Sequence, residues 1–256
     1  MKKIAIIGAG ISGLFFANLL KNSLEYDFTI YEKKTSLDTE DGYGIQLSVN
    51  SIKLLNEIGF NNLDKKEIYN PKKISFINAK NNEEICGLDI SKFNYEKNQY
   101  TTLKRSTLLK FLLNNISKDK IKFNNELKNL NYEKKLTLFL SDNSIEEFDY
   151  LIVSDGIFSK TKSIILNKNI KREYFKSIAV RGNLYDYPNE DISLYLGSNF
   201  HFVIYPVNQN KEFNFILIIR KQLSSQQLLD ENLYKDENFL KSITQELYEK
   251  TLLKLD

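Results

Sequence analysis

Three glycines near the N-terminus have the spacing of a turn that brings backbone close to phosphate groups. Gly8, Gly10 and Gly13 form the pattern G-x-G-x-x-G, with Ser12 inside it. In such a turn the first glycine permits the tight bend, the second lets a pyrophosphate approach the backbone, and the third lets helix and strand pack closely. The free N–H groups at the helix start then face the phosphates. The turn therefore predicts a dinucleotide site.

An acidic residue stands where such a site needs one. Glu32 lies 19 residues after Gly13, near the usual offset of about 20. Its carboxylate can accept hydrogen bonds from ribose hydroxyls, and it would repel a 2′-phosphate. The motif therefore favours FAD or NAD over NADP. Lys33 opens the polar loop that follows.

A strand–helix–strand unit must position these residues. The apolar run 3–7 predicts a strand buried on both faces, and 27–31 predicts a second strand. Between them, 11–20 has helical spacing, and the expected apolar face of this helix consists of Ile11, Leu14, Phe15 and Leu19. The uncharged run 4–20 also imitates a secretory signal or membrane anchor, but its glycines and short length argue against both. We expect no membrane-spanning segment.

Three later segments carry further candidate residues. Ser48 can cap a helix with the apolar stripe Leu54, Leu55 and Ile58. Arg105 opens a second apolar helix, where a bound anion such as pyrophosphate would offset its unfavourable position.

Asp155 and Gly156 follow a third apolar run, 150–153, which we interpret as another buried strand. An acid at the carboxyl end of such a strand lies where α/β ligand sites occur. A strand pair is also expected from 127–130 and 136–140.

The amino-acid composition argues against several classes of function. The chain has 256 residues and a net charge of +3, with Lys residues scattered among acids, which argues against nucleic-acid binding. Cys86 is the only cysteine and His201 the only histidine. We therefore expect no intrachain disulfide, no His/Cys metal site and no Ser-His-Asp triad.

From about residue 178 the pattern changes to long strands rich in aromatic and β-branched residues. We expect strands at 178–185, 192–196, 200–207 and 213–219, forming a mostly antiparallel sheet. Arg181 is a candidate partner for a substrate carboxylate, and Tyr205 is a candidate pocket residue for which core packing is the alternative. A final helix is expected over 236–253, with Phe239, Ile243, Leu247 and Leu252 as its apolar set.

The motifs and their order resemble the class A flavoprotein monooxygenases, the p-hydroxybenzoate and salicylate hydroxylase group. The resemblance spans nearly the whole chain. It is carried by the glycine turn with its acid, by G-Y-G-I-Q-L-S-V-N at 42–50, by the arginine helix at 103–109 and by the D-G segment at 149–159. The segments 179–182 and 201–207 resemble parts of that family's substrate domain.

The resemblance implies an α/β fold with a Rossmann-like FAD-binding domain of the glutathione-reductase type and a mostly antiparallel β-sheet substrate domain. We assign 1–70 and 98–170 to a discontinuous FAD-binding domain, and 71–97 and 171–256 to an incomplete substrate domain. The candidate cofactor-binding residues are Gly8, Gly10, Ser12, Gly13, Glu32, Lys33, Gly44, Gln46, Arg105, Leu127 and Asp155. In that family the backbone near Leu127 borders the adenine. Arg181 and Tyr205 are the substrate candidates, and no catalytic side chain is identified.

The implied activity is hydroxylation of a small aromatic compound by a cytoplasmic FAD enzyme, with NADH or NADPH as reductant and molecular oxygen as co-substrate. The family's later Gly-Asp-Ala-Ala-His type of segment has no counterpart here. The chain is therefore expected to be C-terminally truncated. It could be a non-catalytic FAD-binding remnant, or half of a split flavoenzyme with a partner chain supplying the rest. Another flavin oxidoreductase of this fold, such as a reductase or halogenase, is a further alternative, and an NAD dehydrogenase fits the β-rich second region poorly.

Overall fold

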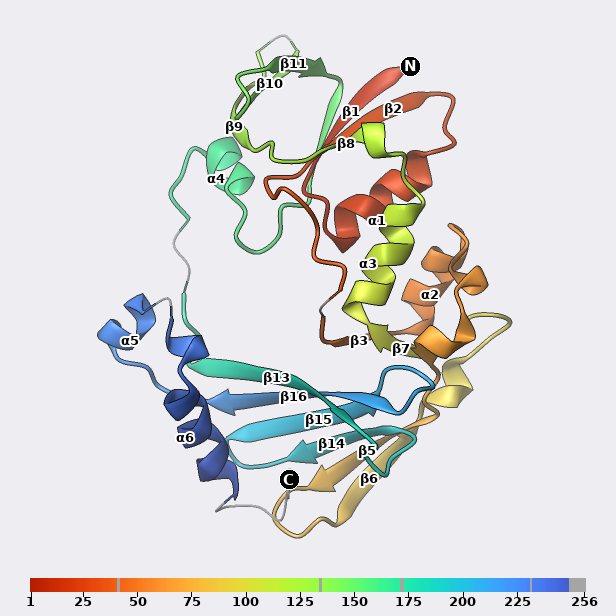
Figure 1. The fold of residues 1–256 in the computed structure, drawn as a ribbon, viewed down its shortest axis with the longest axis vertical. Coiled ribbons are helices and arrows are strands. Elements are labelled where there is room, and N and C mark those ends of the chain that lie inside the picture. The colour runs from red at the N-terminus through yellow and green to blue at the C-terminus, as the bar shows by residue number, and fades with distance from the viewer. Residues whose placement is uncertain (41, 134, 171–172, 231, 249–256) are drawn as a thin grey trace. The chain divides into compact units, whose positions relative to one another are not determined.

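A computed structural model describes residues 1–40, 42–133, 135–170, 173–230 and 232–248 of the chain (Figure 1). It divides into two compact units, each built from separate stretches of sequence. The first unit comprises Met1–Gly42, Leu54–Leu63 and Arg105–Arg172. The second comprises Tyr43–Lys53, Asp64–Lys104 and Glu173–Asp256.

A four-stranded parallel sheet forms the centre of the first unit, in the order β12-β1-β2-β8. Its strands are β1 (Lys2–Ile7), β2 (Tyr26–Tyr31), β8 (Ile121–Lys122) and β12 (Tyr150–Val153). The apolar residues 4–7 of β1 are all buried, as the sequence predicts for a strand covered on both faces.

Helices α1 (Ile11–Leu20), α3 (Arg105–Asn114) and α4 (Thr161–Leu166) also belong to this unit. The predicted face of α1 is partly wrong, because its buried residues are Gly13, Leu14, Ala17 and Asn18, while Leu19 is 45% exposed. Small residues face inward because the helix lies very close to the turn before it. Asn18 faces inward because its side-chain amide donates to the carbonyl oxygens of Leu14 and Leu112, both at 2.9 Å.

An antiparallel three-stranded sheet packs its apolar side chains with those of β1 and β2. It consists of β9 (Leu127–Asn131), β10 (Leu136–Leu140) and β11 (Ile145–Phe148). The predicted pairing of the first two strands is confirmed. Ala5, Ile7 and Tyr31 share one buried cluster with Leu127 and Leu138. This cluster fixes the start of β9 beside the carboxyl ends of the parallel strands.

The interpretation of 150–153 as a buried strand is wrong. In the described part of the chain, β12 pairs only with β1 and stands at the end of its sheet. Tyr150 is 43% exposed and Val153 is 40% exposed for this reason. The composition of the strand is that of an interior strand, whereas its position is that of an edge.

The second unit contains a six-stranded sheet in the order β13-β16-β15-β14-β5-β6 (Figure 1). Its strands are β5 (Lys73–Asn78), β6 (Glu84–Asp89), β13 (Ser177–Tyr185), β14 (Ile192–Leu196), β15 (Phe200–Pro206) and β16 (Glu212–Arg220). Neighbouring strands are antiparallel except β14 and β5, so the predicted mostly antiparallel sheet is confirmed.

A smaller antiparallel sheet shifts the unit boundaries away from the predicted ones. Its order is β3-β7-β4, with β3 (Gly44–Leu47), β4 (Ile68–Tyr69) and β7 (Thr101–Lys104). β3 and β4 each pair with β7, and the backbone N–H of Gly44 donates to the side-chain oxygen of Asn214 at 2.6 Å. Residues 43–53, 64–70 and 98–104, predicted for the first domain, therefore group with the second unit.

The remaining helices differ in detail from expectation. Helix α2 (Val49–Asn56) begins directly after Ser48 and buries Ile52 and Leu55. Leu54, predicted for its apolar stripe, is 48% exposed, because residues three apart share a helix face and a neighbouring residue does not. Helices α5 (Ser225–Leu229) and α6 (Glu237–Tyr248) follow the large sheet.

The predicted helix over 236–253 is represented by α6, in which Ile243 is buried and packs with Phe239 in the core of the large sheet. The side chain of Leu247 and all of Leu252 fall outside the described residues.

Candidate functional site

The glycine turn joins β1 to α1 with little free space. Gly8 has a φ of +102°, and a Cβ on it would lie 2.5 Å from the carbonyl oxygen of Ser154. A Cβ on Gly13 would lie 2.0 Å from the carbonyl oxygen of Gly8. Packing of the protein on itself therefore explains these two glycines.

Gly10 is different, because nothing in the described protein requires it. A Cβ on Gly10 would meet no atom within 4 Å, and its φ of −73° with ψ of −179° is an extended conformation open to any residue. Gly10 precedes the first residue of α1 and lines a cavity. Neither backbone strain nor protein packing explains this glycine, which stands at a helix N-terminus and faces a cavity. Its missing side chain would let an anionic group approach the helix closely.

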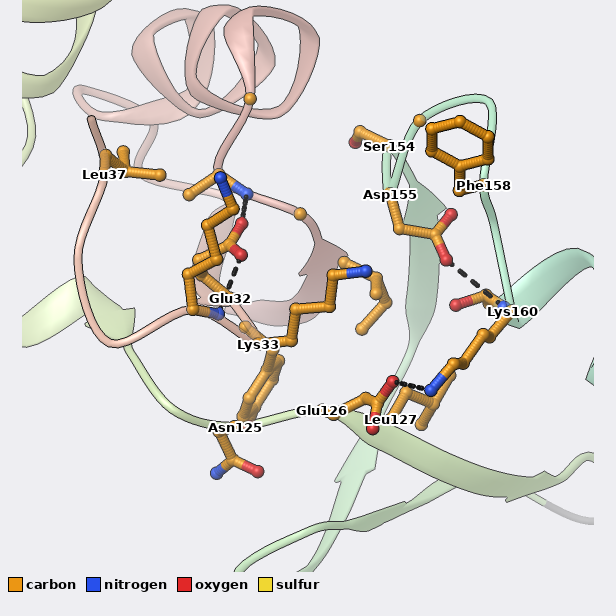
Figure 2. Close-up of a pocket in the computed structure, with 18 of the residues that line it drawn as sticks. Glu32, Lys33, Leu37, Asn125, Glu126, Leu127, Ser154, Asp155, Phe158 and Lys160 are labelled. Carbon is orange, nitrogen blue, oxygen red and sulfur yellow. Dashed lines mark hydrogen bonds and ion pairs between the residues drawn. The ribbon is translucent and has the colours of Figure 1, made fainter. Parts of the chain in front are cut away.

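Glu32 lies at the carboxyl end of β2 and is only 8% exposed. One carboxylate oxygen accepts the backbone N–H of Ala9 at 2.9 Å, and the other accepts the backbone N–H of Lys34 at 3.0 Å (Figure 2). The carboxylate thus ties the glycine turn to the loop after β2. Its remaining lone pairs can accept from hydroxyl groups in the cavity.

The end of β12 lines a second side of the same cavity. The backbone N–H of Ser154 donates to the carbonyl of Ile7, which places Asp155 beside the glycine turn. One oxygen of Asp155 accepts the backbone N–H of Thr161 at 3.2 Å. In the described part of the chain, the other Asp155 oxygen and the hydroxyl of Ser154 are buried without a hydrogen-bond partner. A buried polar atom without a hydrogen-bond partner destabilises the folded protein, and a bound polar group could supply the partners for these two atoms.

The third wall comes from the segment between β8 and β9. The backbone N–H of Glu32 donates to Lys122, and that of Asn125 donates to Glu32, so the chain runs beside the end of β2. Glu126 and Leu127 follow at the cavity, and Leu127 is 3% exposed.

Glu126 forms two ion pairs, with Lys128 at 2.5 Å and with Lys160 at 2.8 Å. Hydrogen bonds from these two ammonium groups lower the pKa of Glu126 to about 2, and the carboxylate therefore stays charged at neutral pH.

These walls enclose a cavity of about 250 Å³ in the first unit. Seven of the eleven predicted cofactor-binding residues line it, namely Gly8, Gly10, Glu32, Lys33, Arg105, Leu127 and Asp155. Figure 2 shows the Lys33 side chain extending into the cavity from the loop after β2. Ser12 lines an adjoining depression together with Asp155, and Gly13 lies beneath the turn.

Gly44 and Gln46 lie on β3 in the second unit and do not line this cavity. The side-chain oxygen of Gln46 accepts the hydroxyl of Tyr100 at 2.8 Å. Their assignment to the cofactor stays a prediction.

The two substrate candidates also lie in the second unit. Arg181 is exposed on β13, whereas Tyr205 on β15 is 1% exposed and packs with Ile192 and Val207. Burial raises the pKa of the Tyr205 hydroxyl above its ordinary range, and the nearby positive charge of Arg181 partly opposes the rise. The packing of Tyr205 favours the core interpretation over direct exposure to a substrate.

Sequence reasoning missed Ser154, Glu126 and Lys160, which all line the cavity. Ser154 had a usable signal, since it stands between the predicted strand and Asp155. Glu126 and Lys160 had none, because each is an ordinary charged residue until the fold brings them together.

No group of three or more His, Cys, Asp or Glu side chains among the described residues is arranged to hold a metal ion. No described helix is long and apolar enough to cross a membrane.

The profile of the NAD(P)-binding Rossmann-like domain family matches residues 6–39, the strand–turn–helix–strand unit. The FAD-dependent monooxygenase dpchE of Colletotrichum higginsianum is 25% identical over 171 residues, covering 63% of this chain and 35% of that protein.

Solved structures agree in fold. HpxO of Klebsiella pneumoniae, crystallised with FAD and uric acid, has a TM-score of 0.76 at 19% identity, covering 95% of this chain and 64% of its own. A salicylate hydroxylase in complex with its substrate has a TM-score of 0.73 at 16% identity, covering 98% of this chain and 66% of its own. This chain therefore spans about a third of the curated relative and under two thirds of these structures. The chain therefore shares the fold of these solved structures, and the curated protein that it resembles is an FAD-dependent monooxygenase.

Proposed function

We propose that the cavity of the first unit binds FAD through its ADP half. The observation that carries this proposal is Gly10, whose missing side chain is explained by neither backbone strain nor protein packing. The partnerless buried oxygens of Ser154 and Asp155 support it, because a bound polar group would satisfy them. HpxO, which shares the fold, was crystallised with FAD.

Each side of the cavity would contact a different part of the ADP half. Backbone N–H groups at the start of α1 donate to the pyrophosphate, and Glu32 accepts from the ribose. Lys33 and Arg105 line the same cavity and supply positive charge for the phosphates. The backbone near Leu127 borders the adenine. The negative charge of Glu32 disfavours a nucleotide carrying a 2′-phosphate.

We further propose that the working enzyme is a monooxygenase of small aromatic compounds that uses NADH or NADPH. Bound FAD would supply the redox and oxygen-activating chemistry. One atom of O₂ enters the aromatic ring and the other leaves as water, with NAD(P)H giving the two electrons. The protein's part is to bind, orient and exclude water. The six-stranded sheet, with Arg181 at its surface, is the proposed substrate wall.

The test of the activity uses ¹⁸O₂. The chain is loaded with FAD, supplied with NADH or NADPH, and offered a panel of phenols and aromatic acids. A hydroxylated product that carries the label is expected. NAD(P)H oxidation in which every oxygen atom ends in hydrogen peroxide or water, with no labelled product for any compound, would contradict the hydroxylase and favour another flavin oxidoreductase.

Replacing Glu32 with glutamine tests the ribose contact. The amide keeps one acceptor oxygen but turns its NH₂ group toward one of the two backbone donors, leaving a buried N–H without an acceptor. We expect the free energy of unfolding to fall by about 1–3 kcal/mol, and ADP binding, measured by calorimetry, to weaken about tenfold. Glu40→Gln is the matched control, because the Glu40 side chain is 83% exposed and pairs with Lys110. Unchanged ADP affinity in Glu32→Gln would remove Glu32 from the site.

A second candidate is that this chain is the FAD-binding part of an enzyme completed by another polypeptide. The edge of β12 favours it. Tyr150 and Val153 are exposed on an entirely apolar strand, beside a groove of about 1120 Å³ that Phe16 and Ile165 also line. Natural edge strands usually carry charges, prolines or bulges against unwanted pairing. Turnover of an aromatic substrate by this chain alone would contradict this candidate, whereas tight FAD binding without turnover would support it.

A further inference from the structure

An ion pair closes one side of the nucleotide cavity. The Lys160 ammonium reaches across to Glu126 at 2.8 Å, and Figure 2 shows the two side chains meeting at the cavity wall. Glu126 stands just before β9, and Lys160 just before α4. The pair therefore joins two walls that come from distant parts of the sequence.

On the far side of this wall lies a second cavity of about 560 Å³. The residues shared by both linings are Glu126, Leu127, Gly156, Phe158 and Lys160. Among them, Glu126 and Lys160 form the ion pair that joins the start of β9 to the loop after β12. Lys128 contacts the same carboxylate but lines only the second cavity.

The loop held by this ion pair carries two of the cavity's buried polar atoms without partners in the described part of the chain, the Ser154 hydroxyl and one Asp155 oxygen. Asp155 is bound to the N–H of Thr161, the residue next to Lys160, so the position of Lys160 is transmitted to Asp155. Gly156, between them, has a φ of +79°, and no atom lies within 4 Å of the place where a Cβ would stand, so protein packing restrains this residue little. A loop with these features needs an anchor to keep one geometry.

We propose that the Glu126–Lys160 ion pair is a latch that holds the Asp155 loop in place and sets the affinity of the cavity for adenosine nucleotides. The inference rests on the proposed nucleotide function and assigns both residues as positioning residues. The Lys160 side chain is 69% exposed, and exposed ion pairs contribute little to folding. Breaking the latch should therefore reduce binding while leaving the fold intact.

Two variants and two probes test the latch. Lys160→Met and Glu126→Gln each break it, and adenosine and ADP report on binding with and without phosphate charge. We expect both variants to bind both probes about threefold to fivefold more weakly, with unchanged thermal unfolding in Lys160→Met. Lys128→Met is the control and should bind like the unmodified chain. Lys160→Arg should restore most of the affinity lost in Lys160→Met.

Other outcomes overturn the proposal in distinguishable ways. If the pair acted only through its charges, Glu126→Gln would free a cation near the phosphates and ADP would bind more tightly, with adenosine unaffected. Equal affinity of all variants for both probes would show that the ion pair is not a latch. If the unmodified chain bound neither probe, the proposed nucleotide function would fail, and the latch with it.

Discussion

Replacing Gly10 with valine is expected to abolish FAD binding without harming the fold. The extended conformation of Gly10 suits any residue, and a Cβ there meets no protein atom within 4 Å. The added methyl groups would instead occupy the space through which a pyrophosphate approaches the N-terminus of α1. We expect the affinity for FAD and for ADP to fall at least about 100-fold, or about 2.7 kcal/mol.

Calorimetry with ADP and the flavin absorbance retained after gel filtration both measure this loss. The free energy of unfolding of Gly10→Val should stay within about 1 kcal/mol of that of the unmodified chain, which separates lost binding from lost structure. Gly59→Ala is a control for lost stability in the same unit, since Gly59 has a φ of +93° and lies outside the cavity lining, so this variant should be less stable but keep its affinity for ADP. Retention of FAD by Gly10→Val would mean that the glycine turn is not the pyrophosphate site.

Gly13→Ala is expected to have the opposite profile, with a large loss of stability. Its Cβ would stand 2.0 Å from the carbonyl oxygen of Gly8, which is backbone and has no freedom to swing away. Helix α1 would have to move off β1, and overpacking of this kind costs about 3 kcal/mol. Buried Leu14 and Ala17 would lose contacts as the helix shifted.

Urea unfolding followed by far-ultraviolet circular dichroism would measure the change in Gly13→Ala. Gly10→Ala, in the same turn, is the matched substitution and should stay within about 1 kcal/mol of the unmodified chain. Equal stability of Gly13→Ala and the unmodified chain would show that α1 does not pack on the turn as closely as the structure indicates.

The sequence predicted the elements of the glycine turn because their signals are local. Strand β1 follows from a continuous apolar run, helix α1 follows from its helical spacing, and Glu32 follows from its offset. The buried face of α1 was predicted less well, because hydrophobicity ranks Leu19 above Gly13 and Ala17. Close packing of a helix on a strand reverses that order, since small residues permit the approach.

The position of β12 shows a different limit. Tyr150–Val153 has the composition of an interior strand, and the composition alone predicts burial on both sides. Which strands lie beside it depends on pairing between distant segments, which local patterns do not encode. The same limit applies to Gly44 and Gln46, which group with the second unit because β3 pairs with β7.

The cavity-lining residues that belong to a sequence motif could be predicted, whereas those that form an ion pair could not. Gly10, Glu32 and Asp155 belong to recognisable motifs, and all line the cavity. Glu126 and Lys160 belong to none, because an ion pair between distant residues leaves no spacing rule.

The most direct test of the account is the visible absorption spectrum of the purified chain after FAD is added and the excess removed. The account predicts a retained flavin spectrum, because the glycine turn, Glu32 and the end of β12 already form the ADP half of the site. Protein that elutes colourless and fails to bind ADP by calorimetry would contradict it.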